Sequence, residues 1–207
     1  MNINKHLIPL FSVLFFLFAV SVSSGCFRKN ESDVKSVVRN ELDQLKNPDS
    51  ETTQKYIPYT ELFPDATENT DLTDEINETF SLFFRKFNYK ISDVIVGTAN
   101  HSATVSVKLT TIDSKVLARD FKAELLRTQI TESAQAQKGS IKDSSRSLEA
   151  HYLILNHLLN TNDYDTAETD CNIQLVNTGN DKKEKWKIQR TNSLEDDLVG
   201  GLIADLA

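Results

Sequence analysis

Two long stretches of the chain alternate apolar and polar side chains. In residues 103–112 the apolar positions of one face are Ala103, Val105, Val107 and Leu109. In residues 166–176 the inward positions are Ala167, Thr169, Cys171, Ile173 and Leu175, which are apolar except for the threonine. Because successive side chains of a strand point to opposite faces, each run predicts a strand with one buried and one solvated face. Such half-exposed strands are typical of antiparallel sheets.

Each of these strands has a partner nearby in the sequence. Residues 89–96 precede the first across a turn at 97–102, and residues 184–190 follow the second across a turn at 177–183. Both turns are rich in Gly, Asn, Ser or Thr, the residues that join antiparallel strands. The sequence therefore predicts two hairpins and a four-stranded antiparallel sheet.

Apolar residues at helical spacing predict helices before, between and after the hairpins. The expected helices cover residues 32–47, 70–87, 114–130, 146–160 and 192–206. The small, polar residues 131–146 are expected to connect the inserted pair, and Gly200-Gly201 to mark close helix packing or a break. The fold class is thus α+β: a sheet packed against helices, with a helical pair inserted between the hairpins.

The N-terminus carries a separate signal. After Lys5, residues 7–22 form a charge-free apolar run. It is shorter than the roughly 20 residues that span a bilayer, which favours the apolar segment of a secretory signal peptide. Small residues and Cys26 follow at once.

Ser24-Gly25-Cys26 resembles the end of a bacterial lipoprotein signal, although Ser23 stands where that signal usually has Leu. The resemblance implies a signal peptide over residues 1–25 and a lipid on Cys26, which is diacylated through its sulfur and becomes the mature N-terminus. An ordinary secretory signal and an uncleaved N-terminal anchor are the alternatives.

A lipoprotein signal has consequences for the rest of the chain. It predicts a short spacer at 26–31, one domain at 32–207, and a location on the extracytoplasmic face of the cell membrane. The loss of Lys5 lowers the net charge from −7 to −8, so electrostatics give no argument for nucleic-acid binding. Cys171 is then the only thiol without a lipid, and its alternating surroundings predict a buried core thiol.

A further resemblance lies in the second half of the chain. Residues 103–113 (ATVSVKLTTID) lead into a helix, and residues 185–188 (KWKI) precede residues 197–202 (DLVGGL). Together they resemble a group of Gram-positive membrane lipoproteins of uncharacterised function, whose soluble domain is similar to the cystatin/nuclear-transport-factor-2-like fold. The resemblance covers roughly residues 100–207, while the first half matches only in element order. It implies a fold and a location, and it supplies no catalytic residues.

Such a fold hosts both enzymes and binding modules, which use a cone-shaped pocket between sheet and helices. Asp93 is the candidate general base, because strict alternation in its strand would point it inward. An inner face formed by Val94 and Val96 would instead expose it. Tyr89, Tyr152 and Trp186 are the candidates for lining a pocket, with core packing as the alternative.

Metal and cofactor signatures are missing from the sequence. His151 and His157 are six residues apart, which is not the i, i+4 spacing of a helical metal site. The acidic stretch at 163–170 lacks the Gly and Glu that an EF-hand loop needs. We therefore expect no metal site and no cofactor.

Lysines alternate along one face of the last predicted strand, at positions 183, 185 and 187. Beside an anionic membrane they could orient the domain, and a solvated, edge-protecting face is the alternative.

The expected function is a membrane-anchored lipoprotein with a non-catalytic binding module for an unknown protein or small-molecule ligand. The alternatives are a carrier or enzyme with a cone pocket, and a structural partner in envelope or transporter assembly.

Overall fold

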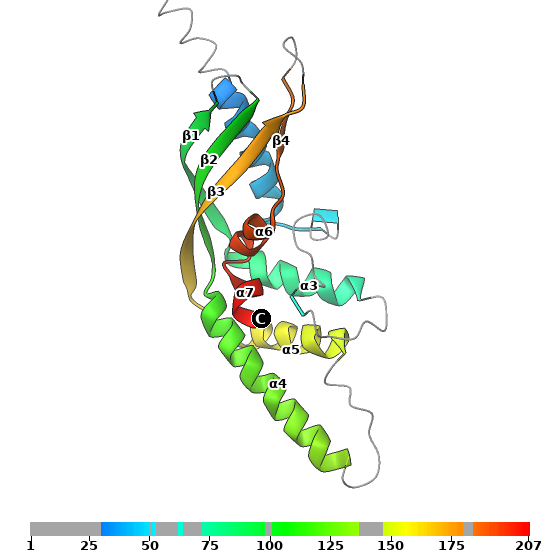
Figure 1. Cartoon of the computed structure of the whole chain (residues 1–207). Coiled ribbons are helices and arrows are strands. Elements are labelled where there is room, and N and C mark those ends of the chain that lie inside the picture. The colour runs from blue at the N-terminus through cyan, green and yellow to red at the C-terminus, as the bar shows by residue number, and fades with distance from the viewer. Residues whose placement is uncertain are drawn as a thin grey trace, which may run out of the picture.

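The computed structural model describes residues 30–49, 51–52, 62–63, 72–97, 101–136, 147–179 and 184–207. The predicted signal peptide, the predicted lipid-attachment residue Cys26 and Lys183 lie outside these residues. Within them, the predicted α+β fold is confirmed: a four-stranded antiparallel sheet packs against helices (Figure 1).

The sheet has the strand order β1-β2-β3-β4. Its strands are β1 (Asn88–Val96), β2 (Ser102–Ile112), β3 (Thr166–Asn177) and β4 (Trp186–Ile188). All neighbouring strands are antiparallel, and the long pairing of β2 with β3 joins the two predicted hairpins into one sheet. β4 is shorter than expected and pairs with residues 175–177 of β3.

β1 changes its inner face at a β-bulge. The register with β2 shifts between Ile91 and Asp93, so one extra residue interrupts the alternation. Beyond the bulge Val94 and Val96 take the inner positions, and Asp93 turns to the outer face. The structure thus has the second of the two patterns that the sequence allows for this strand.

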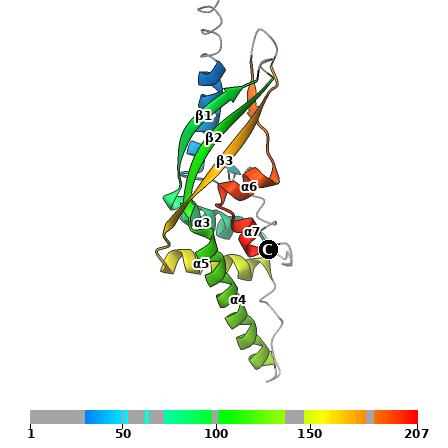
Figure 2. The ribbon, with the colours of Figure 1, turned by 60° about the vertical axis from the view of Figure 1, so that its left-hand side comes forward.

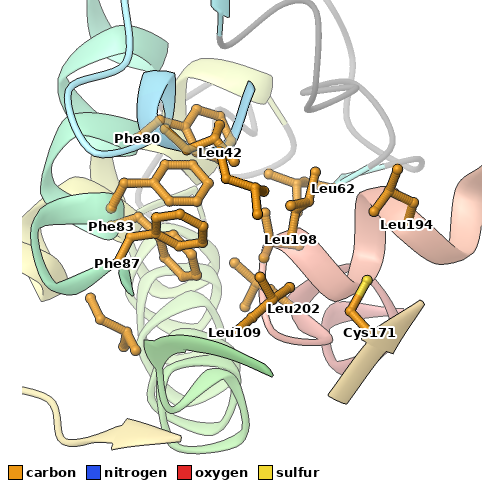
Figure 3. Close-up of a cluster of buried hydrophobic side chains, with 14 of the residues drawn as sticks. Leu42, Leu62, Phe80, Phe83, Phe87, Leu109, Cys171, Leu194, Leu198 and Leu202 are labelled. Atoms are coloured by element: carbon orange, nitrogen blue, oxygen red, sulfur yellow. The ribbon is translucent and has the colours of Figure 1, made fainter. Parts of the chain in front are cut away.

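The inner face of the sheet packs against helices from both ends of the chain. A helix over residues 30–44 buries Val34, Val38 and Leu42, one apolar residue per turn. α3 (Thr73–Phe83) adds Phe80 and Phe83. Figure 3 shows how side chains from these helices meet Leu109 of β2 and leucines from the C-terminal helices.

The aromatic helix ends earlier than predicted. After α3 the chain tightens into the short 3-10 helix η1 (Phe84–Lys86), and Phe87 has an extended backbone. Phe80, Phe83, Phe84 and Phe87 are nevertheless all buried. The prediction that these residues form core was therefore correct, although Phe87 lies beyond the helix.

The inserted pair consists of α4 (Ser114–Ala136) and α5 (Leu148–Thr161). Asp113 caps α4, because its carboxylate accepts the backbone N–H groups of residues 115 and 116. Contrary to prediction, residues 131–136 continue α4. Both views show α4 projecting away from the sheet (Figures 1 and 2), and its distal part exposes Leu126 and Ile130.

The C-terminal segment forms two short helices rather than the one that was predicted. α6 (Asn192–Leu198) is capped by Thr191, whose hydroxyl accepts the N–H of Leu194. α7 (Leu202–Leu206) follows after Gly200 and Gly201, which have φ angles of 65° and 89°. These left-handed conformations make the expected break in the helix.

Candidate functional site

Asp93 lies on the outer, exposed face of β1. Its carboxylate accepts the backbone N–H of Val94 at 2.9 Å. β1 and β4 are the two edge strands, so β2 and β3 separate Asp93 from Trp186 by about 14 Å at the usual strand spacing. The structure does not bring the candidate base together with Trp186.

The three aromatic candidates contribute to packing around the core. Tyr152 is fully buried, and its ring contacts those of Phe63 and Phe80 with centroids at 5.3 and 6.3 Å. Trp186 is buried, and its indole N–H donates to Glu184. Tyr89 is half-buried and packs against the same core from β1.

Tyr89 also fixes the helix over residues 30–44 to the sheet. Its hydroxyl donates to the Asp43 carboxylate at 2.9 Å, and the Lys46 ammonium lies 4.8 Å from the centre of its ring. Burial, together with the hydrogen bond to Asp43, raises the pKa of Tyr89 to about 12. Hydrogen bonds from Lys46 and Tyr89 lower the pKa of Asp43. The group is a structural clamp between the helix and the strand.

Cys171 is a buried core thiol, as predicted. Burial raises its pKa to about 12, and the nearby Asp197 carboxylate adds to the shift. Because the thiolate is the reactive form of cysteine, this thiol is unreactive at neutral pH. Asp197 belongs to α6, so the contact joins that helix to β3.

Replacing Asp197 by asparagine is expected to stabilise the protein at neutral pH. Burial raises the pKa of Asp197, the Asp196 charge adds to the shift, and the Cys171 hydrogen bond opposes it. The folded state therefore binds this proton more tightly than the unfolded chain, and the stability contribution falls as pH rises through the folded pKa.

An asparagine side chain removes that titration and still accepts a hydrogen bond from Cys171. Urea unfolding at pH 7 should show the variant more stable than the wild type, and the difference should shrink toward pH 3.8 and below. A difference that is independent of pH would contradict the raised pKa of Asp197.

His151 and Asp163, whose spacing and surroundings in the sequence argue against metal binding, have structural partners. His151 Nδ1 lies 2.8 Å from the Ser147 carbonyl, and its ring packs against the rings of Phe63 and Phe121 with centroids at 4.9 and 5.7 Å. Asp163 pairs with Lys86 at 2.6 Å. Among the residues that the structure describes, no group of three or more His, Cys, Asp or Glu is placed to hold a metal ion.

The outer face of the sheet is open and polar. Side-chain hydrogen bonds cross from β2 to β3 at three levels, joining Thr104 to Gln174, Ser106 to Asn172 and Lys108 to Glu168. The acidic side chains Glu168 and Asp170 lie toward the α4 end of this face, and Asp93 lies near its middle, level with Ser106.

The opposite end of the outer face has a different composition. Here β1 and β3 end and β2 and β4 begin, and the exposed residues include Ile95, Val176, Lys185 and Lys187. We call these four residues the hairpin-end surface. Sequence reasoning singled out its lysines but not its apolar members, although Val176 stands out as an apolar residue at a polar position of the alternating run.

Replacing Asp93 by alanine is expected to change the free energy of unfolding by no more than about 0.5 kcal/mol, as is usual for exposed positions. The measurement is denaturant unfolding of the two proteins side by side. A loss of several kcal/mol would show that Asp93 is buried and partnered.

The described helices include none that is both long and apolar enough to cross a bilayer. No protein-family model, curated protein or solved structure matches the chain. What is established is therefore the α+β architecture with its antiparallel sheet, while the lipoprotein signal and the family resemblance remain predictions.

Proposed function

We propose that the chain is a lipoprotein anchored to the outer side of the cell membrane, and that its folded part is a non-catalytic binding or interaction module. The observation that carries the anchor is the charge-free run at residues 7–22 that ends in Ser24-Gly25-Cys26. A sulfur-linked diacylglycerol at Cys26 supplies the two acyl chains that stable anchoring needs, where a single chain binds only reversibly.

The packing of the described residues supports a module that works through its surface. Phe83, Phe84 and Trp186, which would border an interior cone, are all buried within one core. Asp93, the candidate base of the enzyme alternative, lies on the outer face. That alternative therefore has no support in this geometry.

One observation favours a protein partner over a small molecule. The distal part of α4 projects from the body, and its Leu126 and Ile130 side chains are 57% and 61% exposed. They are one helical turn apart and form a short apolar stripe. This agrees with the alternative of a partner role in envelope or transporter assembly.

Replacing Cys26 by serine tests the anchor. The full chain is expressed in a Gram-positive bacterium fed with an alkyne-tagged palmitate, and the incorporated label is measured after purification. We expect label in the wild type and none in Cys26→Ser, because serine offers no sulfur for the thioether. The matched control is Cys171→Ala, which removes the only other cysteine and should keep the label.

The mass of the mature N-terminus distinguishes the alternatives. A diacylated Cys26 supports the lipoprotein, an unmodified start after cleavage indicates an ordinary secretory signal, and an intact Met1 indicates an uncleaved anchor. Either of the last two results, or label that persists in Cys26→Ser, would overturn the proposal.

A further inference from the structure

We propose that the hairpin-end surface, made of Ile95, Val176, Lys185 and Lys187, rests on the anionic lipid headgroups of the membrane that holds the anchor. This inference rests on the proposed lipoprotein function and adds an orientation of the folded part on the membrane, together with the class of lipid that it contacts.

The direction of the first helix places the anchor at the hairpin end. Tyr89, at the start of β1, contacts residues 39 and 43 of the helix over residues 30–44. Residue 30 therefore lies toward the other end of β1, where Figures 1 and 2 both show the start of this helix beside the tips of the strands.

The spacer between the lipid and this helix is short. Three residues separate Cys26 from residue 30, and the four steps between them reach about 14 Å even when fully extended. The hairpin end is thus the only end of the described fold that so short a spacer can hold at the membrane, since β1 alone spans about 30 Å.

The hairpin end of the outer face carries two exposed lysines. Lys187 of β4 and Lys185 just before it are exposed, and Lys187 pairs directly with Val176 of β3. Glu168 and Asp170 lie in the other half of this face, where Lys108 pairs with Glu168, and Asp93 lies near the middle, level with Ser106. A membrane of anionic lipids attracts basic residues near its surface and repels acidic ones. Lys185 and Lys187 therefore favour contact through the hairpin end, and the nearby Asp93 opposes it.

The exposed apolar residues also favour membrane contact through the hairpin end. Ile95 is 61% exposed and Val176 is 37% exposed, both on the outer face within two residue levels of each other. Apolar side chains bordered by lysines suit the boundary between headgroups and acyl chains. A solvated face that only protects the sheet edge needs the lysines but gives no role to Ile95.

Acidic residues also lie near this end and oppose the contact. Glu31 and Asp33 are exposed on the first turn of the N-terminal helix, and Glu184 precedes β4. Glu184 is engaged by the Trp186 indole. Glu31 and Asp33 come from the helix that covers the inner face of the sheet, so the proposed contact through the outer face does not include them.

The test uses the full chain, purified with its lipid and reconstituted into vesicles. An environment-sensitive fluorophore is attached at Ser102→Cys, an exposed position opposite Val176 on the outer face. Cys171 does not compete for the label because it is buried. Quenching by nitroxide groups on the upper acyl chains measures contact, in vesicles of phosphatidylcholine alone or mixed with phosphatidylglycerol.

We expect strong quenching in the mixed vesicles, weaker quenching in neutral ones, and a decrease at high salt. In mixed vesicles, quenching in the Lys185→Glu/Lys187→Glu variant should fall to the level that the wild type shows in neutral vesicles. The matched control, Lys115→Glu/Lys122→Glu on α4, makes the same charge change at exposed residues far from this surface and should quench like the wild type. A fluorophore at Ser133→Cys should remain unquenched throughout.

The experiment tests the orientation and the anchor independently, because the mass of the N-terminus is measured on the same sample. A diacylated chain without quenching at Ser102→Cys overturns the orientation and leaves the anchor intact. Quenching in a chain that lacks the lipid supports the surface and overturns the anchor. Equal quenching in both charge-reversed variants shows that the lysines are not the contact and overturns the proposal.

Discussion

Replacing Gly200 by alanine is expected to lower the free energy of unfolding by about 3 kcal/mol. Gly200 has a φ of 65°, and an added Cβ would lie 2.3 Å from the Thr111 hydroxyl oxygen and 3.3 Å from its Cβ. The left-handed backbone costs a non-glycine residue about 1–2 kcal/mol, and overpacking a buried site adds about 1–3 kcal/mol. Urea unfolding of both proteins measures the difference.

Gly201 provides the matched control. Its φ is 89°, but the atom nearest to an added Cβ is 3.8 Å away. Gly201→Ala should therefore lower the free energy of unfolding only by the cost of backbone strain, about 1–2 kcal/mol. Combining Gly200→Ala with Thr111→Ala should recover part of the loss, because the oxygen that causes the closest contact is gone. Equal losses for the two single variants would rule out a steric cause at Gly200.

The left-handed backbone at Gly200 and Gly201 explains why the end of the chain folds as two helices, and the close approach of Thr111 explains why residue 200 has no side chain. The sequence predicts that Gly200-Gly201 marks packing or a break, and both occur. The sequence does not show which residue packs against Gly200, because Thr111 lies at the end of β2, far away along the chain. A clash between distant residues leaves no trace in local spacing, so only the three-dimensional structure shows which glycine is sterically essential.

The sheet was predictable for a physical reason. A buried face selects apolar side chains at every second position, and β2 and β3 show this pattern over their length. β1 was ambiguous because its bulge shifts the pattern by one residue at Ser92. An inserted residue changes the face of everything that follows, and no composition signal marks it.

The helix boundaries depended on tertiary contacts that the sequence does not display. Residues 131–136 are polar and small, which suggests a loop, yet Glu, Gln and Ala are also good helix formers. Phe87 keeps the spacing of the helix before it but leaves that helix to enter β1. In both places burial was predicted more reliably than backbone conformation.

For the candidate pocket, too, the sequence pattern does not distinguish between two structures. Tyr152 and Trp186 fit the description of pocket lining and of core equally well, since both need a large side chain on an inner face. Which of the two holds depends on whether side chains from other elements fill the space. Those contacts come from α3, α5 and β4 together, and no single periodicity encodes them.

Replacing Phe84 by alanine is expected to cost about 3–5 kcal/mol of unfolding free energy, the usual range for truncating a buried Phe. Phe84 is 1% exposed and lies at the centre of an aromatic chain, with the rings of Phe80, Phe83 and Phe87 at 6.3, 5.3 and 5.4 Å. Alanine would leave a cavity with three aromatic walls. Denaturant unfolding monitored by circular dichroism measures the loss.

The size of this loss also distinguishes a packed interior from a ligand-accepting cone. Phe84→Leu keeps most of the volume and should lose less than the alanine variant, about 1–2 kcal/mol. Leu153→Ala, at a position that is 54% exposed on α5, should change stability by no more than about 0.5 kcal/mol. If Phe84 bordered a water-filled cone, its ring would already contact solvent on one side and its truncation would open no new cavity. A loss for Phe84→Ala as small as that for Leu153→Ala would therefore favour the carrier alternative, whereas a loss near 4 kcal/mol means that aromatic side chains fill the space beneath the sheet.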